Sequence, residues 1–300
     1  MRFSTHAAPK PSSPSIDAAL SDATGLSFAA RSICGPVRAV NEDRAVAIDR
    51  GDAVALVIAD GMGGHAHGRE AAELVVRCCA EAVQARRRTA WCDVLARGIT
   101  EAHAQVRRAA QHHGVDGMGA TVAAAIAERR PSATPILHWA HAGDSRVYLW
   151  RGRTLVRLTD DHSSVAQLVH AGHLSDDEAF DHPDSNIVQR AVGQPRPFEP
   201  ELHTALPLDH GDAVLVCSDG LHGALRDRAI AAVVDGATRA DALCQQLIDA
   251  ALDADSHDNV SVACLIVPPR PRAQRRRPTR ANARRSDART SAPSAEALAR

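Results

Sequence analysis

The pattern of hydrophobic and polar positions predicts short strands combined with a few long helices. Residues 53–59 form a continuous apolar run that ends at Asp60-Gly61, as expected of a strand that is buried on both faces and then enters a turn. Residues 68–86 and 94–111 carry apolar side chains at helical spacing. We therefore expect two long amphipathic helices after the buried strand, and a further helix near residues 240–252.

Runs of apolar and β-branched residues predict most of the remaining strands. They lie at residues 121–127, 136–142, 146–150, 154–158, 201–205, 213–217 and 260–267. Between residues 162 and 185 the chain is instead polar and rich in His and acidic residues, with little to bury. Runs of adjacent strands interrupted by paired helices favour antiparallel sheets covered by helices over a βαβ alternation.

Both ends of the chain lack a sustained apolar period. Residues 1–25 and 268–300 are rich in Pro, Ser, Ala and Arg, so we expect disordered tails on either side of a domain at 26–267. The C-terminal segment holds ten Arg and two acidic residues, a net charge of +8, which leaves −9 on the other 267 residues. An Arg-rich tail could act as a nucleic-acid arm. The acidic domain and a total of eight aromatic residues argue against that interpretation.

The composition also bears on the compartment in which the protein works. No apolar run approaches the roughly 20 residues that a membrane-spanning helix needs, and residues 1–25 lack the features of a secretory signal. Seven scattered cysteines show no Cys-x-x-Cys spacing, and no coherent His or Cys set suits zinc. Histidines such as His113, His203 and His222 are therefore interpreted as surface residues. We expect a cytoplasmic protein with no membrane segment.

Four aspartates lie at the ends of predicted strands, each beside a Gly, Ser or Asn: Asp60, Asp144, Asp219 and Asp258. A fifth, Asp43, closes the tripeptide Asn41-Glu42-Asp43. A single carboxylate at a turn is usually a solvated loop residue. Five that are brought together by the sheets would repel one another unless cations neutralised them. Oxygen ligands favour Mg²⁺ or Mn²⁺, and more than three carboxylates indicates at least two ions.

Two such ions suit the hydrolysis of a phosphate ester. At a separation of roughly 3.5–4 Å they can share a bridging water, lower its pKa and hold the attacking and leaving oxygens of a phosphoryl transfer. A phosphate dianion also needs a cation, and Arg38, five residues before Asp43, can provide a bidentate guanidinium. A surface arginine in an Arg-rich chain is the alternative for Arg38.

Seven short motifs in order, from about Ser27 to Val267, resemble the bacterial PP2C-type (PPM family) metal-dependent serine/threonine protein phosphatases. One of them alone, such as Asp-Gly-x-Gly, is a weak signal, but the whole series at family-like spacing is specific. The motifs are Arg38-Ala39-Val40-Asn41-Glu42-Asp43, Asp60-Gly61-Met62-Gly63-Gly64-His65, Gly117-Met118-Gly119-Ala120-Thr121, Gly143-Asp144-Ser145-Arg146, Asp160-Asp161-His162-Ser163, Cys217-Ser218-Asp219-Gly220-Leu221 and Asp258-Asn259.

The resemblance implies an α+β fold, a four-layer αββα sandwich in which two antiparallel β-sheets are flanked by helix pairs. It implies that the protein hydrolyses phosphoserine and phosphothreonine in proteins with a metal-bridged water and two Mn²⁺ or Mg²⁺ ions. A weaker third ion is seen in bacterial members. Phosphoproteins, including a Ser/Thr kinase or its targets, are the implied partners of a monomeric enzyme. Residues 163–185 resemble the mobile flap beside the active site.

The resemblance also implies a role for each matching residue. Asp60 bridges both metals with the Gly61 carbonyl on the second, Asp219 and Asp258 hold the first, Glu42 and Asp43 support the second, Asp144 with Asp219 binds the third, and Arg38 holds the phosphate. His65 resembles the general acid that protonates the leaving alkoxide, and an exposed loop residue is the alternative. For His162, which leads into the flap, a structural hydrogen bond is expected rather than catalysis.

Two alternatives remain open from the sequence alone. A catalytically weak sensor or scaffold of the same fold would bind phosphoproteins without hydrolysing them, and loss of a metal aspartate would mark it, yet every one is present. The tetrapeptide Asp-Gly-Met-Gly also occurs twice, at Asp60 and Asp116. Asp60 follows a buried strand, whereas Asp116 follows a polar stretch, so Asp116 is expected to be a dispensable loop residue.

Overall fold

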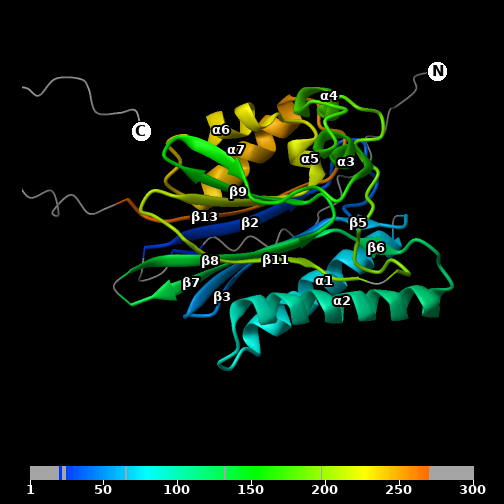
Figure 1. Ribbon diagram of the computed structural model, residues 1–300, viewed down its shortest axis with the longest axis horizontal. Coiled ribbons are helices and arrows are strands. Elements are labelled where there is room, and N and C mark those ends of the chain that lie inside the picture. Colours follow the sequence, from blue (N-terminus) through cyan, green and yellow to red (C-terminus); the bar gives the residue numbers. More distant parts are fainter. Residues whose placement is uncertain (1–19, 22–24, 65, 132, 197, 270–300) are drawn as a thin grey trace, which may run out of the picture. The chain divides into compact units, whose positions relative to one another are not determined.

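Two antiparallel β-sheets pack face to face in a computed structural model that describes residues 20–21, 25–64, 66–131, 133–196 and 198–269 (Figure 1). The first sheet has the strand order β1-β2-β13-β12-β9-β10, and the second has the order β11-β8-β7-β4-β3. A separate two-stranded ribbon pairs β5 with β6. Every paired strand runs antiparallel to its neighbour.

The strands have the following bounds. Those of the first sheet are β1 (Leu20–Ser21), β2 (Ser27–Ile33), β13 (Val260–Ile266), β12 (Ala213–Cys217), β9 (Arg146–Arg151) and β10 (Thr154–Arg157). Those of the second sheet are β11 (Glu201–Pro207), β8 (Ala133–Ala142), β7 (Val122–Arg130), β4 (Ala53–Ala59) and β3 (Arg44–Asp49). The ribbon consists of β5 (Gly61–Met62) and β6 (Gly119–Ala120).

Helices cover the outer face of each sheet, which makes four layers (Figure 1). The long pair α1 (Ala66–Gln84) and α2 (Trp91–His113) lies on the second sheet. The short α5 (Asp219–His222) with α6 (Asp227–Val234) and α7 (Ala240–Asp253) lies on the first. The predicted α+β four-layer sandwich is therefore confirmed, with three helices in place of a pair on one side. No helix among the described residues is long and apolar enough to cross a membrane.

The alternation of side chains along β4 explains how one strand serves two hydrophobic layers. Val54, Leu56 and Ile58 point between the two sheets, whereas the intervening residues of the strand pack against α1 and α2. Successive side chains of a strand face opposite sides, so a strand covered on both faces reads as an unbroken apolar run. The run at residues 53–59 therefore predicted this central strand correctly.

The segment expected to be a flap contains two helices of its own, α3 (Ser164–His170) and α4 (Asp176–Phe180). Ser163 caps α3 by accepting a hydrogen bond from the Ala166 backbone N–H. Ser175 and Glu178 form a reciprocal capping box at α4. Local capping thus gives regular structure to a segment that has little to bury.

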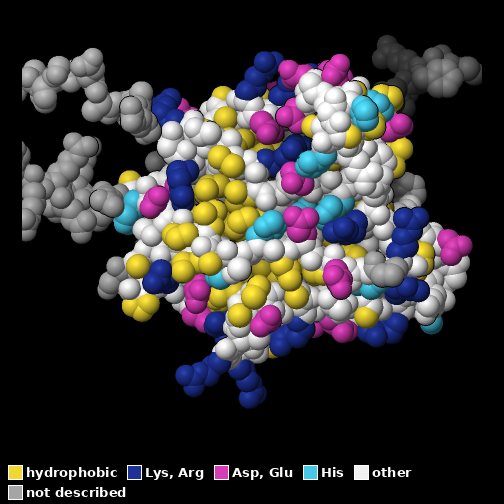
Figure 2. All heavy atoms as spheres, in the orientation of Figure 1, with side chains coloured by type: hydrophobic (Ala, Val, Ile, Leu, Met, Phe, Trp, Pro, Cys, Tyr) yellow, Lys and Arg dark blue, Asp and Glu magenta, His cyan; other side chains and the backbone are white. Residues whose placement is uncertain are grey.

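The predicted domain boundaries differ from the structure at one point. β1 lies within the segment expected to be an N-terminal tail and pairs with β2, Leu20 opposite Phe28. The rest of residues 1–24 and residues 270–300 lie outside the described part of the chain. Each sheet ends in an edge strand, β10 in the first sheet and β11 in the second. Hydrophobic side chains are exposed on the face of the molecule that Figure 2 shows. Val156 of β10 and Leu202 of β11 are each about two-fifths exposed.

Candidate metal centre

The strand ends that carry the predicted aspartates meet at one end of the sandwich. The end of β4 lies beside the start of β3, with Ala59 opposite Arg44. The end of β12 lies between the starts of β13 and β9, with Cys217 opposite both Val262 and Arg146. Because the aspartates lie within two residues of these strand ends, the antiparallel pairing gathers residues as far apart in the sequence as Asp43 and Asp258.

Asp60 and Asp219 form the centre of this group. Their carboxyl groups are close enough to share a hydrogen bond. Burial, and then the charges of Asp43 and other carboxylates, raise the pKa of Asp60 well above its ordinary value. Burial and the charge of Asp258 raise the pKa of Asp219 in the same direction. The Asp219 Oδ1 atom is buried without a hydrogen-bond partner among the described residues.

Asp43 is fully buried and links the two sheets. The Ser218 hydroxyl donates a hydrogen bond of 2.7 Å to Asp43 Oδ2. The backbone N–H of Asp43 donates to the side chain of Asn41 at 3.0 Å. Burial raises the pKa of Asp43 to about 7, against the hydrogen bonds from Ser218 and Ser261, which lower it.

Asp144 lies in the turn between β8 and β9 and is also buried. Burial and the charge of Asp219 raise its pKa well above the ordinary value. Its backbone carbonyl accepts a hydrogen bond from His222 Nε2 at 2.9 Å. His222 was expected on the surface, and that prediction is wrong, because α5 folds it against this turn with 7% of its surface exposed.

Glu42 lies where its own backbone segment approaches those of Gly61 and Gly68 closely. A Cβ atom on Gly61 would lie 2.1 Å from the Gly68 carbonyl oxygen, and one on Gly68 would lie 2.5 Å from Glu42 Oε1. Only glycine leaves room at both positions. These two residues bring the Glu42 carboxylate against the first turn of α1 and next to the Gly61 carbonyl.

Asp258 and Arg38 complete the site at its more exposed edge. Arg38 Nη2 donates to Asp258 Oδ2 at 2.5 Å, and the two side chains are 47% and 33% exposed. The Asp258 loop is held by Asn259, whose Oδ1 accepts the Gly35 N–H at 3.2 Å. Arg38 therefore contacts the carboxylate group and still reaches solvent, where a phosphate could approach it.

This donor set fits divalent cations. The site gathers carboxylates that are mostly buried and raise one another's pKa, together with a buried carboxylate oxygen that has no hydrogen-bond partner. Such a group is costly without a compensating positive charge. Oxygen donors without His or Cys suit Mg²⁺ or Mn²⁺. His65, the predicted general acid, lies outside the described residues.

Sequence reasoning missed the residues that support the aspartates from behind. Arg146 forms a bidentate pair with Asp161, with nitrogen–oxygen distances of 2.7–3.2 Å, and also contacts Tyr148. Thr121 Oγ1 lies 2.6 Å from Ser145 Oγ and accepts the Asp60 N–H at 3.3 Å. Arg146, Asp161, Thr121 and Ser145 stand in the sequence motifs, but their contacts join segments that are far apart in the sequence, so no local pattern revealed their supporting roles.

His162 has the structural role that the sequence predicted. Its Nδ1 accepts the Gly143 N–H at 3.1 Å, and the backbone N–H of His162 donates to the Gly143 carbonyl at 2.9 Å. Asp116 is exposed in the turn between α2 and β6, as expected of a loop residue.

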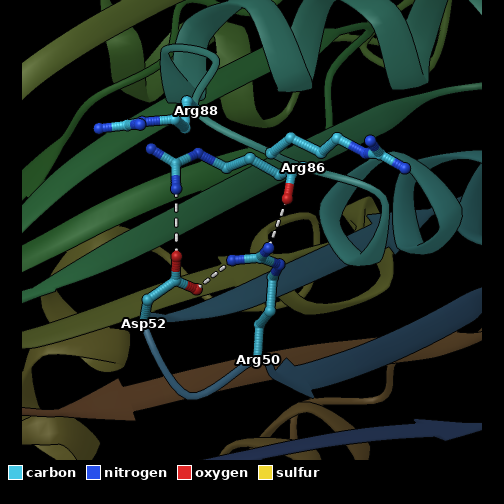
Figure 3. Close-up of a pocket in the computed structure, with 5 residues that line it drawn as sticks. Arg50, Asp52, Arg86 and Arg88 are labelled. Carbon is cyan, nitrogen blue, oxygen red and sulfur yellow. Dashed lines mark hydrogen bonds and ion pairs between the residues drawn. The ribbon is translucent and has the colours of Figure 1, made fainter.

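An arginine-rich pocket lies at the opposite end of the second sheet, between the β3–β4 turn and the α1–α2 loop (Figure 3). Both carboxylate oxygens of Asp52 are paired there, one with Arg50 at 2.5 Å and the other with Arg86 at 3.1 Å. The seven residues of β4 at about 3.3 Å each separate this pocket from Asp60. It therefore takes no part in the metal centre.

Comparisons with known proteins find similar sequences. A model of the protein phosphatase 2C family matches residues 37–254. The protein phosphatase PhpP of Streptococcus pneumoniae is 31% identical over 228 residues, which cover 72% of this chain and 87% of that protein.

Two solved structures are similar to this chain in both fold and sequence. The serine/threonine phosphatase PstP/Ppp of Mycobacterium tuberculosis is 32% identical with a TM-score of 0.72, covering 81% of this chain and 99% of that one. The catalytic domain of PstP in complex with two manganese ions is 32% identical with a TM-score of 0.71, covering 81% of this chain and 98% of that one.

Proposed function

The chain belongs to the protein phosphatase 2C family, and from that premise we propose which of its residues carry out the family's reaction. It is a metal-dependent protein serine/threonine phosphatase, so its substrates are phosphorylated proteins. Hydrolysis is favoured over the alternative of a phosphoprotein-binding scaffold, because the relatives are phosphatases and each predicted metal aspartate is retained.

We assign two divalent ions to the aspartate group. Asp60, on which the charges of three other aspartates act, is assigned to both ions. The Gly61 carbonyl and the carboxylates of Glu42 and Asp43 are assigned to one of these ions. Asp219 and Asp258 are assigned to the other. The observation that carries this proposal is the convergence of Asp43, Asp60 and Asp219 from separate strand ends, with the Asp219 Oδ1 atom buried and without a hydrogen-bond partner among the described residues. A third ion at Asp144 and Asp219 is part of the same proposal.

Bound ions supply an activated water and positive charge for attack on the phosphate ester. The residues of the chain hold and orient the phosphate and the metal-binding carboxylates. Arg38 is placed to bind the phosphate dianion through its guanidinium, with Asp258 fixing the direction of that group. Asp43 is fixed by Ser218, and Asp144 by His222 and the turn at Gly143. His65 is proposed to donate the proton that the leaving alkoxide needs.

Substitution of a proposed ligand tests the assignment. We expect Asp219→Asn to raise the Mn²⁺ concentration for half-maximal hydrolysis of a phosphothreonine peptide by about tenfold or more, since the variant removes one charge from the ion's ligands. Asp253→Asn, an exposed acid near the end of α7, is the matched control and should behave as wild type. Equal Mn²⁺ dependence in both variants would show that Asp219 is not a ligand.

The remaining features of this function are also proposals. We propose that the enzyme works in the cytoplasm as a monomer and reverses the action of a Ser/Thr kinase, on that kinase or on its targets. All seven cysteines are unpaired, which suits a reducing compartment. The Arg-rich segment at 268–300 is proposed to contact acidic partners rather than nucleic acid.

A further inference from the structure

Three side chains outside the aspartate centre meet where β8 pairs with β11. Glu201 lies directly opposite His141, and His203 follows two residues later on the same face of β11. One nitrogen of each histidine and one carboxylate oxygen lie within 4.8 Å of one another. No local sequence pattern indicated this group, because His141 is about 60 residues from Glu201 and His203 and only the strand register brings them together.

The hydrogen bonding of His141 leaves one ring nitrogen available as a ligand. His141 is fully buried, on the face of β8 that points between the sheets. Its Nε2 lies 2.8 Å from the Asp160 carbonyl oxygen, which can only accept, so Nε2 carries the proton. Nδ1 therefore bears a lone pair, and it has no hydrogen-bond partner among the described residues.

This arrangement is typical of a metal-ligating histidine. Such a histidine usually donates its second ring N–H to a backbone carbonyl or a carboxylate, which fixes the tautomer and the orientation of the ring. A buried imidazole nitrogen without a partner is costly in a structural histidine. In His141 the fixed tautomer and the unpartnered nitrogen occur together.

Glu201 and His203 provide the other two donors. Glu201 uses both of its carboxylate oxygens in contacts with histidines. Glu201 Oε1 lies 2.9 Å from His203 Nε2, and Oε2 lies 3.2 Å from His162 Nε2. The His203 ring stacks on Trp139 with centroids 4.9 Å apart.

The group is open to solvent on one side. The side chains of Glu201 and His203 are each somewhat more than one-third exposed, whereas His141 lies beneath them. Figure 2 shows histidine and acidic side chains in a row across the middle of this face. An ion could reach Glu201 and His203 from solvent, whereas the Nδ1 atom of His141 is buried and becomes accessible only when the side chains above it rotate.

We propose that His141, Glu201 and His203 form a binding site for a divalent transition-metal ion of the zinc type, distinct from the aspartate centre. Two imidazoles and one carboxylate with a fourth position open to water is a ligand set that zinc adopts. Tetrahedral ligands at about 2.0–2.1 Å from zinc lie roughly 3.4 Å apart, so small side-chain rotations from the present spacing close the site. Nitrogen donors also separate it chemically from the all-oxygen centre, which suits Mg²⁺ or Mn²⁺.

His162 connects this site to the phosphatase centre. It holds the second oxygen of Glu201 and stacks on His141 with ring centroids 4.5 Å apart. On its other side it binds the backbone of Gly143, the residue before Asp144. It is thus an outer partner of the proposed ligands and orients Glu201.

A second histidine group serves as the comparison. His67, Glu70 and His113 also lie within 4.8 Å of one another, on α1 and the end of α2. His113 and Glu70 are 34% and 40% exposed, and His67 is not fully buried either. The His67 Nδ1 atom is also buried without a hydrogen-bond partner, but no hydrogen bond from Nε2 to a described residue fixes the tautomer of His67. This group is therefore the matched control for binding by histidines whose tautomer is not fixed.

Zn²⁺ titration of the full chain tests the proposal, with saturating Mn²⁺ present to occupy the aspartate centre. We expect one tight equivalent of Zn²⁺ in the wild type and in His113→Ala. His203→Ala and Glu201→Gln should each weaken that equivalent by about tenfold or more, since each loses one ligand. Circular dichroism of each variant verifies that it is folded.

Two further measurements separate this site from the others. Co²⁺ in place of Zn²⁺ should give the absorption of a four-coordinate ion with nitrogen ligands, and His203→Ala should lose it. Asp60→Asn should keep the Zn²⁺ equivalent. Unchanged Zn²⁺ binding in folded His203→Ala and Glu201→Gln would overturn the proposal. Loss of the equivalent in His113→Ala or Asp60→Asn would overturn it as well and place the ion elsewhere.

Discussion

Asp60 and Asp116 begin the same tetrapeptide, yet the fold gives them opposite environments. Asp60 follows a strand that is buried on both faces, and the charges of three other aspartates act on it. Asp116 lies in an exposed turn after α2. At the scale of single residues, a motif therefore acquires its chemistry from the strand that precedes it and from the residues that converge on it.

This difference leads to a paired prediction. Asp60→Asn should lower the hydrolysis of an aryl phosphate by at least about a hundredfold, or about 2.7 kcal/mol of barrier, because it removes the charge assigned to both ions. Asp116→Asn should stay within about twofold of the wild type. Steady-state rates at saturating Mn²⁺ provide the measurement. A comparable loss of turnover in the two variants would mean that the site is misplaced.

The sequence predicted the aspartates of the site better than their surroundings. Asp60 and Asp219 could be found because each stands where an apolar run stops, a local signal. Ser218 and His222 could not, since their importance comes from contacts with Asp43 and Asp144 across the fold. Such long-range partners depend on strand register, which one sequence does not reveal.

At the scale of elements, the segment that follows β2 packs closely against the loop before β13, and this contact fixes the position of Asp258. A Cβ atom on Gly35 would lie 2.0 Å from the Asp258 carbonyl oxygen, a separation that real Cβ atoms do not show. The obstacle is backbone rather than a movable side chain. Gly35 is therefore required if the loop is to keep its place.

Gly35→Ala is expected to displace Asp258 and with it the partner of Arg38. We predict a rise of about tenfold in the Mn²⁺ concentration for half-maximal activity, because one proposed ligand moves while the others stay. The thermal unfolding midpoint should be recorded alongside, so that loss of fold is distinguished from loss of metal. Wild-type Mn²⁺ dependence in a folded variant would show that the loop can relax without moving Asp258.

The Arg146–Asp161 pair joins the start of β9 to the segment after β10. Both side chains are largely buried, at 15% and 11% exposure, and the pair is bidentate. Asp161→Asn would leave the Arg146 guanidinium without its carboxylate. We expect the free energy of unfolding to fall by about 3–5 kcal/mol in a urea titration. Adding Arg146→Met should recover part of that loss, and no recovery would show that the charge is not the cause.

The Arg146–Asp161 pair also makes the stability of the fold depend on pH in a predictable direction. Burial acts to raise the pKa of Asp161, but the Arg146 charge and hydrogen bond lower it below its ordinary value. The folded state therefore favours the carboxylate, and this stabilisation is fully present above the unfolded pKa of about 3.9. It is lost as the pH falls through the folded-state pKa. The stability difference between wild type and Asp161→Asn should accordingly shrink below about pH 4.

Elements could be predicted where a periodic apolar pattern was long. The helices expected at 68–86 and 94–111 and the strand at 53–59 are present within a few residues of their predicted bounds. The helices α3 and α4 were not predicted, because they bury few side chains and are set by caps instead. The spacing of Ser175 and Glu178 was the local signal that could have revealed α4.

At the scale of the whole molecule, the described fold closes before the Arg-rich segment begins. β13 is the last strand and ends at Ile266, fully inside the first sheet. Residues 270–300 carry ten of the chain's arginines, and from their composition we expect them to contribute little to the core. The catalytic domain should therefore be independent of this segment.

Truncation after Pro269 tests that independence. The shortened chain should keep its unfolding midpoint and its rate on an aryl phosphate within about twofold, whereas its association with acidic or phosphorylated proteins should weaken. Thermal unfolding and steady-state kinetics give the comparison with the full chain. A tenfold loss of small-substrate turnover, about 1.4 kcal/mol of barrier, would place the segment in the active site or on the domain.

The most direct test of the account is the metal dependence of the full-length enzyme on a phosphothreonine peptide. After exhaustive chelation and removal of the chelator, the account predicts no measurable phosphate release, because no side chain in the aspartate centre can replace the metal-activated nucleophile. Turnover should return, and saturate, as Mn²⁺ or Mg²⁺ is added back. Undiminished release of phosphate from the chelated enzyme would contradict the central claim.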